Sequence, residues 1–195
     1  MSRGDERLLP VSELRLVGEH NQANALAALA LGEQMGLPMI SMLNTLRHFS
    51  GLPHRTQWVA DIDGVVWYND SKGTNVGATI SAIQGFSNPV ILIAGGQGKG
   101  ADFSPLRDAV AANTRAVILL GEDAPKIEKA LANSVPVTCV KDMESAVRTA
   151  QSQSHPGDVV LLSPACASFD MYADFEARGD AFISAVNALK KGEAS

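Results

Sequence analysis

Short runs of Val, Ile, Leu and Ala alternate with helical patterns over most of the chain, and this alternation restricts the fold more than any other feature. Strands are expected at 90–94, 116–120, 135–140 and 159–162, after a hairpin formed by 56–60 and 65–68. Helical patterns begin near Asn75, Phe103, Ala124 and Met143, and a last one begins near Asp170. Continuous apolar strands between helices are typical of a parallel sheet that helices cover on both faces. The predicted fold class for residues 54–195 is α/β, with a Rossmann-like, doubly wound and mostly parallel sheet.

The first fifty residues do not continue this pattern. An alternating stretch at 11–17 predicts a strand, and the Ala- and Leu-rich stretch at 21–35 predicts a helix that is buried on most sides. A second helix is expected at about 41–49, with Ser41 able to cap its first turn. The Gly-Leu-Pro sequence at 51–53 then predicts a boundary between a domain at 1–51 and another at 52–195. Because a strand and two helices do not make a self-sufficient core, residues 1–51 are interpreted as the tail of a domain whose beginning is absent.

Composition and charge argue against several classes of function. The formal net charge is −5, and the 16 Lys and Arg residues are scattered, which argues against a nucleic-acid partner. No apolar run approaches the roughly 20 residues of a membrane-spanning helix, and the polar start lacks the apolar region of a signal peptide. The two cysteines have neither zinc-ligand spacing nor the density of a disulfide scaffold. We therefore expect a soluble, cytoplasmic protein with reduced thiols, no membrane association and no metal ligands in this chain.

Ligands of open α/β sheets bind beyond the carboxyl ends of the strands, and the segment after the hairpin is rich in polar groups there. Residues 69–75 read NDSKGTN, directly before a helix start. Plain helix capping by Thr74 or Asn75 is one interpretation. The other is a nucleotide site, in which Asp70 holds ribose hydroxyls and Lys72 neutralises a phosphate next to the helix N-terminus.

A second unusual loop, GGQGKGAD at 95–102, follows the next predicted strand. It is not a Walker A loop, because that motif needs another Gly before the Gly-Lys pair and Ser or Thr after the Lys. Four glycines around Lys99 still allow the backbone to approach an anionic ligand, with the ammonium group as a compact charge. The alternative is a flexible turn with a solvated Lys.

Three further segments carry candidate site residues. The small and hydroxyl residues of SPACASFD at 163–170 allow an anion to approach a helix start, whereas a nucleophilic role for Cys166 is disfavoured because no partner for it is visible. Asn21 and Asn24 share a helix face and can read the edge of an adenine, although capping explains Asn21 equally well. His54 and Arg55 lie at the expected domain joint, where ligand clefts are common. Phe175 is a core residue by default.

Taken in order, the segments GEHNQANALAALAL, GLPHR, NDSKGTN, GGQGKGADF and LLSPACASFDMYADFEARG closely resemble the Mur ligase family, from about Leu8 to Leu189. The SPACAS segment and the aromatic-rich helix after it point to the family member that adds D-glutamate to UDP-N-acetylmuramoyl-L-alanine in peptidoglycan synthesis. The resemblance implies an ATP-dependent ligase that forms an acyl phosphate. It also implies that residues 1–51 are the end of a central ATP-binding domain, whose Walker A loop and Mg²⁺ ligands belong to a missing portion.

The resemblance further implies roles for individual residues. Asn21 and Asn24 would contact the adenine, His54 and Arg55 would line the nucleotide, Asp70 would hold the ribose, and Lys72 would fix the phosphate end. The implied catalytic residues are His54, Arg55 and Lys72. The implied D-glutamate pocket consists of Thr74, Lys99, Ser168, Phe169 and Phe175. Two positions depart from the family pattern, since Gly73 stands where Ala is usual and Gln97 where Asp is usual.

Three hypotheses follow for the chain as a whole. The first is the carboxy-terminal part of this ligase, inactive alone because acyl phosphate formation needs the missing phosphate cradle and Mg²⁺ site. The second is a stand-alone nucleotide or amino-acid binding module. The third is a related Mur or folylpolyglutamate-type ligase of different specificity. For the ligase, rotation near residues 51–53 is expected to close the site.

Overall fold

The computed structural model of the 195-residue chain describes all residues except 5, 15–17, 50 and 193–195. By its internal contacts the chain divides into two compact units, Met1–Leu52 and Pro53–Ser195. Each unit is described by itself. Among the described helices, none combines the length and apolarity needed to cross a membrane.

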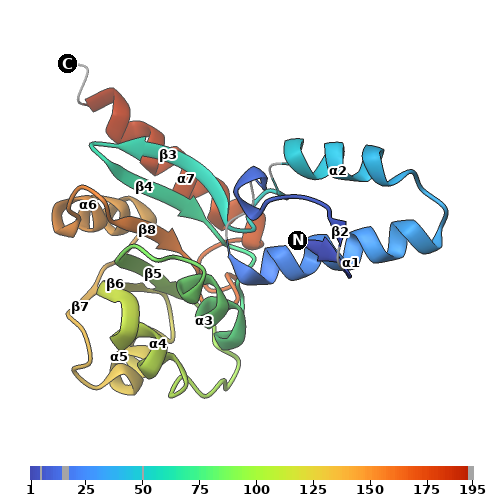
Figure 1. Ribbon diagram of the computed structural model, residues 1–195. Coiled ribbons are helices and arrows are strands. Elements are labelled where there is room, and N and C mark those ends of the chain that lie inside the picture. Colours follow the sequence, from blue (N-terminus) through green and yellow to red (C-terminus); the bar gives the residue numbers. More distant parts are fainter. Residues whose placement is uncertain (5, 15–17, 50, 193–195) are drawn as a thin grey trace. The chain divides into compact units, whose positions relative to one another are not determined.

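The described residues of the first unit form two α-helices, a short 3-10 helix and a small two-stranded sheet (Figure 1). Strands β1 (Ser2–Arg3) and β2 (Glu6–Arg7) pair antiparallel, and the helices are α1 (Glu19–Gln34) and α2 (Met39–His48). Both helices were predicted. The expected capping of the second by Ser41 is wrong, because Pro38 precedes the helix, which begins at Met39, and Ser41 lies within its first turn.

Two other predictions for this unit are also wrong. Val11–Glu13 forms the 3-10 helix η1, not a strand, because the chain turns after Pro10 and Leu14 N–H donates to the Val11 carbonyl. The rest of the predicted strand, 15–17, lies outside the described residues. Helix α1 is not buried on most sides, since Leu26 and Leu31 are 40% and 67% exposed. The apolar cluster here is small and offers few partners: Leu9, Leu14 and Ala25, with Met1, Leu43 and Leu46 against it.

The second unit is the predicted doubly wound α/β domain (Figure 1). Its six-stranded sheet has the order β3-β4-β8-β5-β6-β7, in which β3 is antiparallel to β4 and all other neighbours are parallel. The strands are β3 (Gln57–Ile62), β4 (Val65–Asn69), β5 (Val90–Gly95), β6 (Thr114–Leu120), β7 (Val137–Cys139) and β8 (Val159–Leu162). Strands β5 and β8 are buried along their whole length, as their uninterrupted apolar sequences predict.

Helices cover both faces of this sheet. Helices α6 (Met143–Gln153) and α7 (Phe175–Gly192) pack together and against β3, β4, β5 and β6. On the other side α4 (Leu106–Asn113) packs between α3 (Val76–Gln84) and α5 (Ala124–Leu131), with α4 and α5 against β5 and β6. One hydrophobic core lies under α6 and α7, where the fully buried Trp67 and Phe182 meet.

The start of α7 corrects one prediction. A helix was expected near Asp170, but α7 begins at Phe175. The carbonyl of Ser168 accepts hydrogen bonds from the N–H groups of Met171 and Tyr172, so the chain turns before it becomes helical. The Asp174 carboxylate then accepts from Ala177 N–H in the first turn of the helix. The loop after β8 is therefore longer than predicted, and it belongs to the carboxyl edge of the sheet.

Candidate functional site

The loops after β4, β8, β5 and β6 meet at the carboxyl edge of the sheet, because these four strands are parallel neighbours. Main-chain hydrogen bonds tie each loop to its neighbours. They run from Asp70 N to Leu162 O (2.7 Å), Ala165 N to Gly73 O (2.9 Å), Gly95 N to Pro164 O (2.9 Å) and Asp123 N to Gly96 O (3.0 Å). The candidate polar side chains therefore lie on loops that main-chain hydrogen bonds connect to one another.

The carboxylate of Asp70 links its own loop to two other segments, at Thr56 and Ser163. Its Oδ1 accepts a hydrogen bond from Thr56 N–H at 3.0 Å, and its Oδ2 accepts one from Ser163 Oγ at 2.7 Å. The residue is 8% exposed. The structure thus gives Asp70 a structural role that the sequence did not reveal, while ribose binding by this carboxylate stays a prediction.

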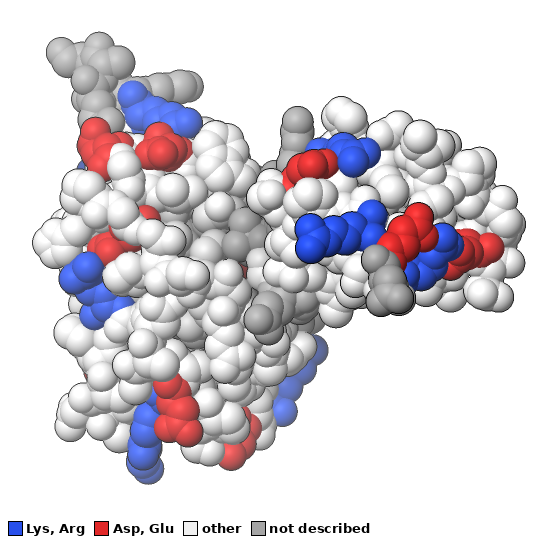
Figure 2. Space-filling model, in the orientation of Figure 1, with Lys and Arg blue, Asp and Glu red and all other residues white. Residues whose placement is uncertain are grey.

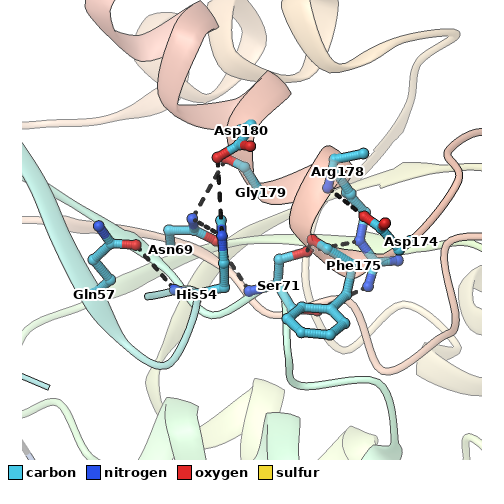
Figure 3. Close-up of polar contacts among 10 residues, drawn as sticks. His54, Gln57, Asn69, Ser71, Asp174, Phe175, Arg178, Gly179 and Asp180 are labelled. Atoms are coloured by element: carbon cyan, nitrogen blue, oxygen red, sulfur yellow. Dashed lines mark hydrogen bonds and ion pairs between the residues drawn. The ribbon is translucent and has the colours of Figure 1, made fainter. Parts of the chain in front are cut away.

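His54 is buried and held in a fixed orientation (Figure 3). Ser71 N–H donates to Asn69 Oδ1 at 3.0 Å, which sets the orientation of the amide so that Asn69 Nδ2 donates to His54 Nδ1 at 3.0 Å. The neutral imidazole then carries its proton on Nε2, which lies 3.9 Å from Asp180 Oδ1. A Cβ on Gly179 would lie 2.2 Å from His54 Nδ1, so the close approach of α7 requires glycine.

Lys72, which is partly buried, points toward an aromatic ring. Its Nζ lies 3.8 Å from the centroid of the Phe175 ring, and its backbone N–H donates to the His54 carbonyl at 3.0 Å. Ser71 Oγ donates to the Phe175 carbonyl at 2.8 Å. The start of α7 is thereby fastened to the loop that carries Lys72.

Arg178 is a site residue that the sequence reasoning missed. It is 2% exposed, and its guanidinium donates to Ser71 Oγ (3.0 Å), Ser71 O (2.9 Å) and Cys166 O (3.1 Å). Burial lowers the pKa of Arg178 to about 10. A signal was present in the sequence, since Arg178 lies four and eight residues before the buried Phe182 and Val186, on one helix face.

Lys99 lies on the neighbouring loop in a left-handed conformation, with φ 53°, between two glycines. Gln97 and Ala167 exchange two main-chain hydrogen bonds of 2.9 Å, which join this loop to the loop after β8. Lys99 Nζ lies 5.1 Å from the centroid of the Phe169 ring, and that residue is 61% exposed. Because these bonds of Gln97 are main-chain bonds, they do not depend on its side chain.

The remaining predicted residues are placed as follows. Ser168 is 2% exposed, Thr74 is partly buried, and Arg55 is exposed. Asn75 caps α3 by accepting a hydrogen bond from Ala78 N–H at 2.9 Å, which confirms the capping interpretation for Asn75 and not for Thr74. Asn21 and Asn24 lie on α1, in the first unit.

Among the residues that the structure describes, no carboxylate forms an ion pair with Lys72 or Lys99, the two lysines of this edge. None pairs with Arg178 either, but its guanidinium is buried and bound by Ser71 and Cys166. The nearby Asp123 is paired with Lys126, and this hydrogen bond, with that from Gly98 N–H, lowers the Asp123 pKa. Cations without a counter-ion favour an anionic ligand. Elsewhere on the surface, basic and acidic side chains are interspersed on the face that Figure 2 shows.

The described residues offer no group of three or more His, Cys, Asp or Glu side chains that could hold a metal ion. The anionic portion of ATP fits the loop after β4, where none of the described carboxylates forms an ion pair with Lys72.

This geometry defines a class of protein. It is a doubly wound α/β domain with lysines at the carboxyl edge of its sheet that form no ion pair with a described carboxylate. The family model described as "Mur ligase, glutamate ligase domain" matches residues 54–166, and the chain belongs to this family. The family resemblance noted in the sequence is thereby confirmed.

Comparisons with individual proteins agree. The UDP-N-acetylmuramoylalanine--D-glutamate ligase of Nitrosococcus oceani is 59% identical over 189 residues, which are 96% of this chain and 42% of that protein. The enzyme of the same name from Legionella pneumophila strain Lens is 56% identical over 193 residues, 97% of this chain and 43% of that protein. The chain thus spans about two fifths of the length of these relatives.

Solved structures show the same fold at low identity. UDP-N-acetylmuramate-alanine ligase from Thermotoga maritima matches with a TM-score of 0.66 at 17% identity, over 90% of this chain and 39% of that chain. Folylpolyglutamate synthase from Mycobacterium tuberculosis, crystallised with ADP, matches with a TM-score of 0.67 at 16% identity, over 88% of this chain and 41% of that chain. These likenesses establish the fold.

Proposed function

We propose that this chain is the carboxy-terminal portion of an ATP-dependent ligase that adds D-glutamate to UDP-N-acetylmuramoyl-L-alanine in the cytoplasm. The observation that carries the proposal is the 59% identity, over 96% of the chain, to a relative named for D-glutamate ligation. Identity at this level over 96% of the chain also disfavours a ligase of different specificity. In this proposal residues 1–51 come from a central ATP-binding domain, and residues 52–195 form the ligase domain.

The proposed reaction forms one amide bond. ATP would supply the phosphoryl group that converts the carboxylate of UDP-N-acetylmuramoyl-L-alanine into an acyl phosphate. The amine of D-glutamate then attacks the acyl carbon, the bond to phosphate breaks, and the amine loses a proton. The residues of this chain bind and orient the reactants for that attack.

Roles can be assigned to the cations from their position. Lys72, at the end of β4, would hold the phosphate end of the nucleotide, and His54 and Arg55 would line it. Lys99, beside the exposed ring of Phe169, would bind a carboxylate of D-glutamate, with hydroxyl donors from Thr74 and Ser168. Asp70 would contact the ribose, and Asn21 and Asn24 the adenine.

Calorimetric titration of the purified chain with D-glutamate and with ADP tests these roles. A charge-assisted hydrogen bond contributes about 1.5–3 kcal/mol, so Lys99→Ala is expected to weaken D-glutamate binding about 10- to 100-fold. Nucleotide binding should change little. Lys129→Ala, which removes an exposed lysine of α5, is the matched control. Equal losses for both ligands in Lys99→Ala would refute the assignment, and binding of L-glutamate as tight as D-glutamate would refute the proposed substrate.

A further inference from the structure

The ring of Phe175 contacts two residues that the family resemblance assigns to the nucleotide. One is Lys72, whose Nζ lies 3.8 Å from the ring centroid. The other is His54, whose ring meets Phe175 edge to face, with centroids 6.0 Å apart and planes at 82°. The resemblance instead implies a contact between Phe175 and D-glutamate. These two contacts place the ring beside the residues implied for the nucleotide.

The backbone beneath this ring is fixed from several sides (Figure 3). The Phe175 carbonyl accepts a hydrogen bond from Ser71 Oγ at 2.8 Å, and Ser71 Oγ accepts one from Arg178 Nε at 3.0 Å. Ser71 N–H is bound by Asn69 Oδ1, on the last residue of β4. Ser71 directly precedes Lys72. The segment that carries the lysine is therefore hydrogen-bonded to the segment that carries the ring, at the residue next to Lys72.

We propose that the side chain of Phe175 is a positioning residue for Lys72. The ring face attracts the ammonium group through its quadrupole and holds it in one direction. It does so without neutralising the charge, and it accepts no conventional hydrogen bond, so the three N–H donors of Lys72 stay available to an anion. A carboxylate in the place of the ring would hold the lysine equally well but would compete with that anion. The functional consequence rests on the proposed function, in which the anion is the phosphate end of a nucleotide.

The size of the effect follows from the setting. A cation–π contact is stronger when it is shielded from water than at an exposed site, and Lys72 is partly buried. Loss of the ring is therefore expected to weaken binding at Lys72 about tenfold. Phe175→Leu removes the π face and keeps an apolar side chain, whereas Phe175→Tyr keeps the π face.

The first test is nuclear magnetic resonance of the 195-residue chain without ligand. A ring 3.8 Å from Nζ must shift the ε-methylene protons of Lys72 upfield. That shift should be lost in Phe175→Leu and kept in Phe175→Tyr. Phe169→Leu is the matched control, since it removes the ring beside Lys99 and should leave Lys72 unchanged. Unshifted Lys72 protons in the wild-type chain, or a shift that survives in Phe175→Leu, would overturn the proposal.

The second test compares titrations with ADP and with D-glutamate. Phe175→Leu should weaken ADP binding about tenfold and D-glutamate binding little, Phe175→Tyr should restore ADP binding, and Phe175→Leu should have no further effect in a Lys72→Met background. Loss of D-glutamate binding alone would overturn the proposal in favour of a direct substrate contact. If the wild-type chain binds neither ligand, the proposed function of the isolated chain fails, while the methylene shifts still decide whether the ring positions Lys72.

Discussion

Ser163 Oγ donates a 2.7 Å hydrogen bond to Asp70 Oδ2, which ties the first residue after β8 to the first residue after β4. Gly73 lies directly against this pair. A Cβ at position 73 would lie 2.5 Å from Asp70 Oδ2 and 2.6 Å from Ser163 Oγ, closer than non-bonded atoms normally approach. The Asp70–Ser163 bond in its present geometry therefore depends on glycine at position 73.

Replacement of Gly73 by alanine is expected to destabilise the second unit. The added methyl must push apart two buried polar groups that bind each other, and overpacking of this kind costs about 1–3 kcal/mol. Urea denaturation of Gly73→Ala, compared with the wild-type chain, measures the change in the free energy of unfolding.

Gly77→Ala is the matched control for this substitution. Gly77 lies in α3, and a Cβ there would come no closer than 3.5 Å to Asn75 Oδ1. Alanine in a helix is favoured over glycine by up to about 1 kcal/mol, so this variant should be as stable as the wild type or more stable. Similar losses in both variants would show that crowding of Asp70 and Ser163 is not the cause.

The sheet was predictable because its strands are short, continuous apolar runs. Burial on both faces removes the need for polar alternation, so the runs ending at Gly95 and Leu162 stand out in the sequence. Local patterns failed where packing decides the outcome. Helix α1 has an apolar sequence like that of a buried helix, but in the described chain Leu26 and Leu31 are exposed.

The candidate site was predictable for residues in polar loops at strand ends, such as Lys72 and Lys99. Arg178 was missed because its partners are distant in sequence, Ser71 being 107 residues away. In addition, a charged residue on a helix is by default expected to be exposed to solvent. Only the fold shows that this guanidinium lies between the loops after β4 and β8.

Arg178 should be important for stability despite the cost of burying its charge. Arg178→Met would leave the buried carbonyls of Ser71 and Cys166 without the donors that they now have. Each unsatisfied buried acceptor costs about 1–3 kcal/mol, so a loss of at least about 2 kcal/mol is expected by urea denaturation. The exposed Arg148, paired with Glu144 on α6, provides the control variant Arg148→Met, which should lose less than about 1 kcal/mol. A stable Arg178→Met would mean that relief of desolvation offsets the lost hydrogen bonds.

The two cysteines should differ strongly in reactivity. Cys139 is exposed, whereas Cys166 is fully buried, and its pKa is raised to about 12, mainly by burial. Because the thiolate is the reactive form, Cys166 in a Cys139→Ser variant should react with a disulfide reagent at pH 8 at least about a hundredfold more slowly than Cys139 in a Cys166→Ser variant. Both should react at similar rates in denaturant. Fast reaction of Cys166 in the native chain would contradict its burial.

The raised pKa of Cys166 also predicts how stability changes in alkaline solution. In the unfolded chain this thiol ionises near its ordinary pKa of 9.0, but in the folded chain it keeps its proton until about pH 12. Above pH 9 the folded state therefore binds more protons than the unfolded state, and its stability falls as the pH rises toward 12.

Cys166→Ala removes this dependence, so the difference in unfolding free energy between the two proteins should be constant below pH 9. Above pH 9 it should shift progressively in favour of the alanine variant. Urea denaturation at a series of pH values from 7 to 10.5 measures that difference, and a constant difference over the whole range would show that the Cys166 pKa is not raised.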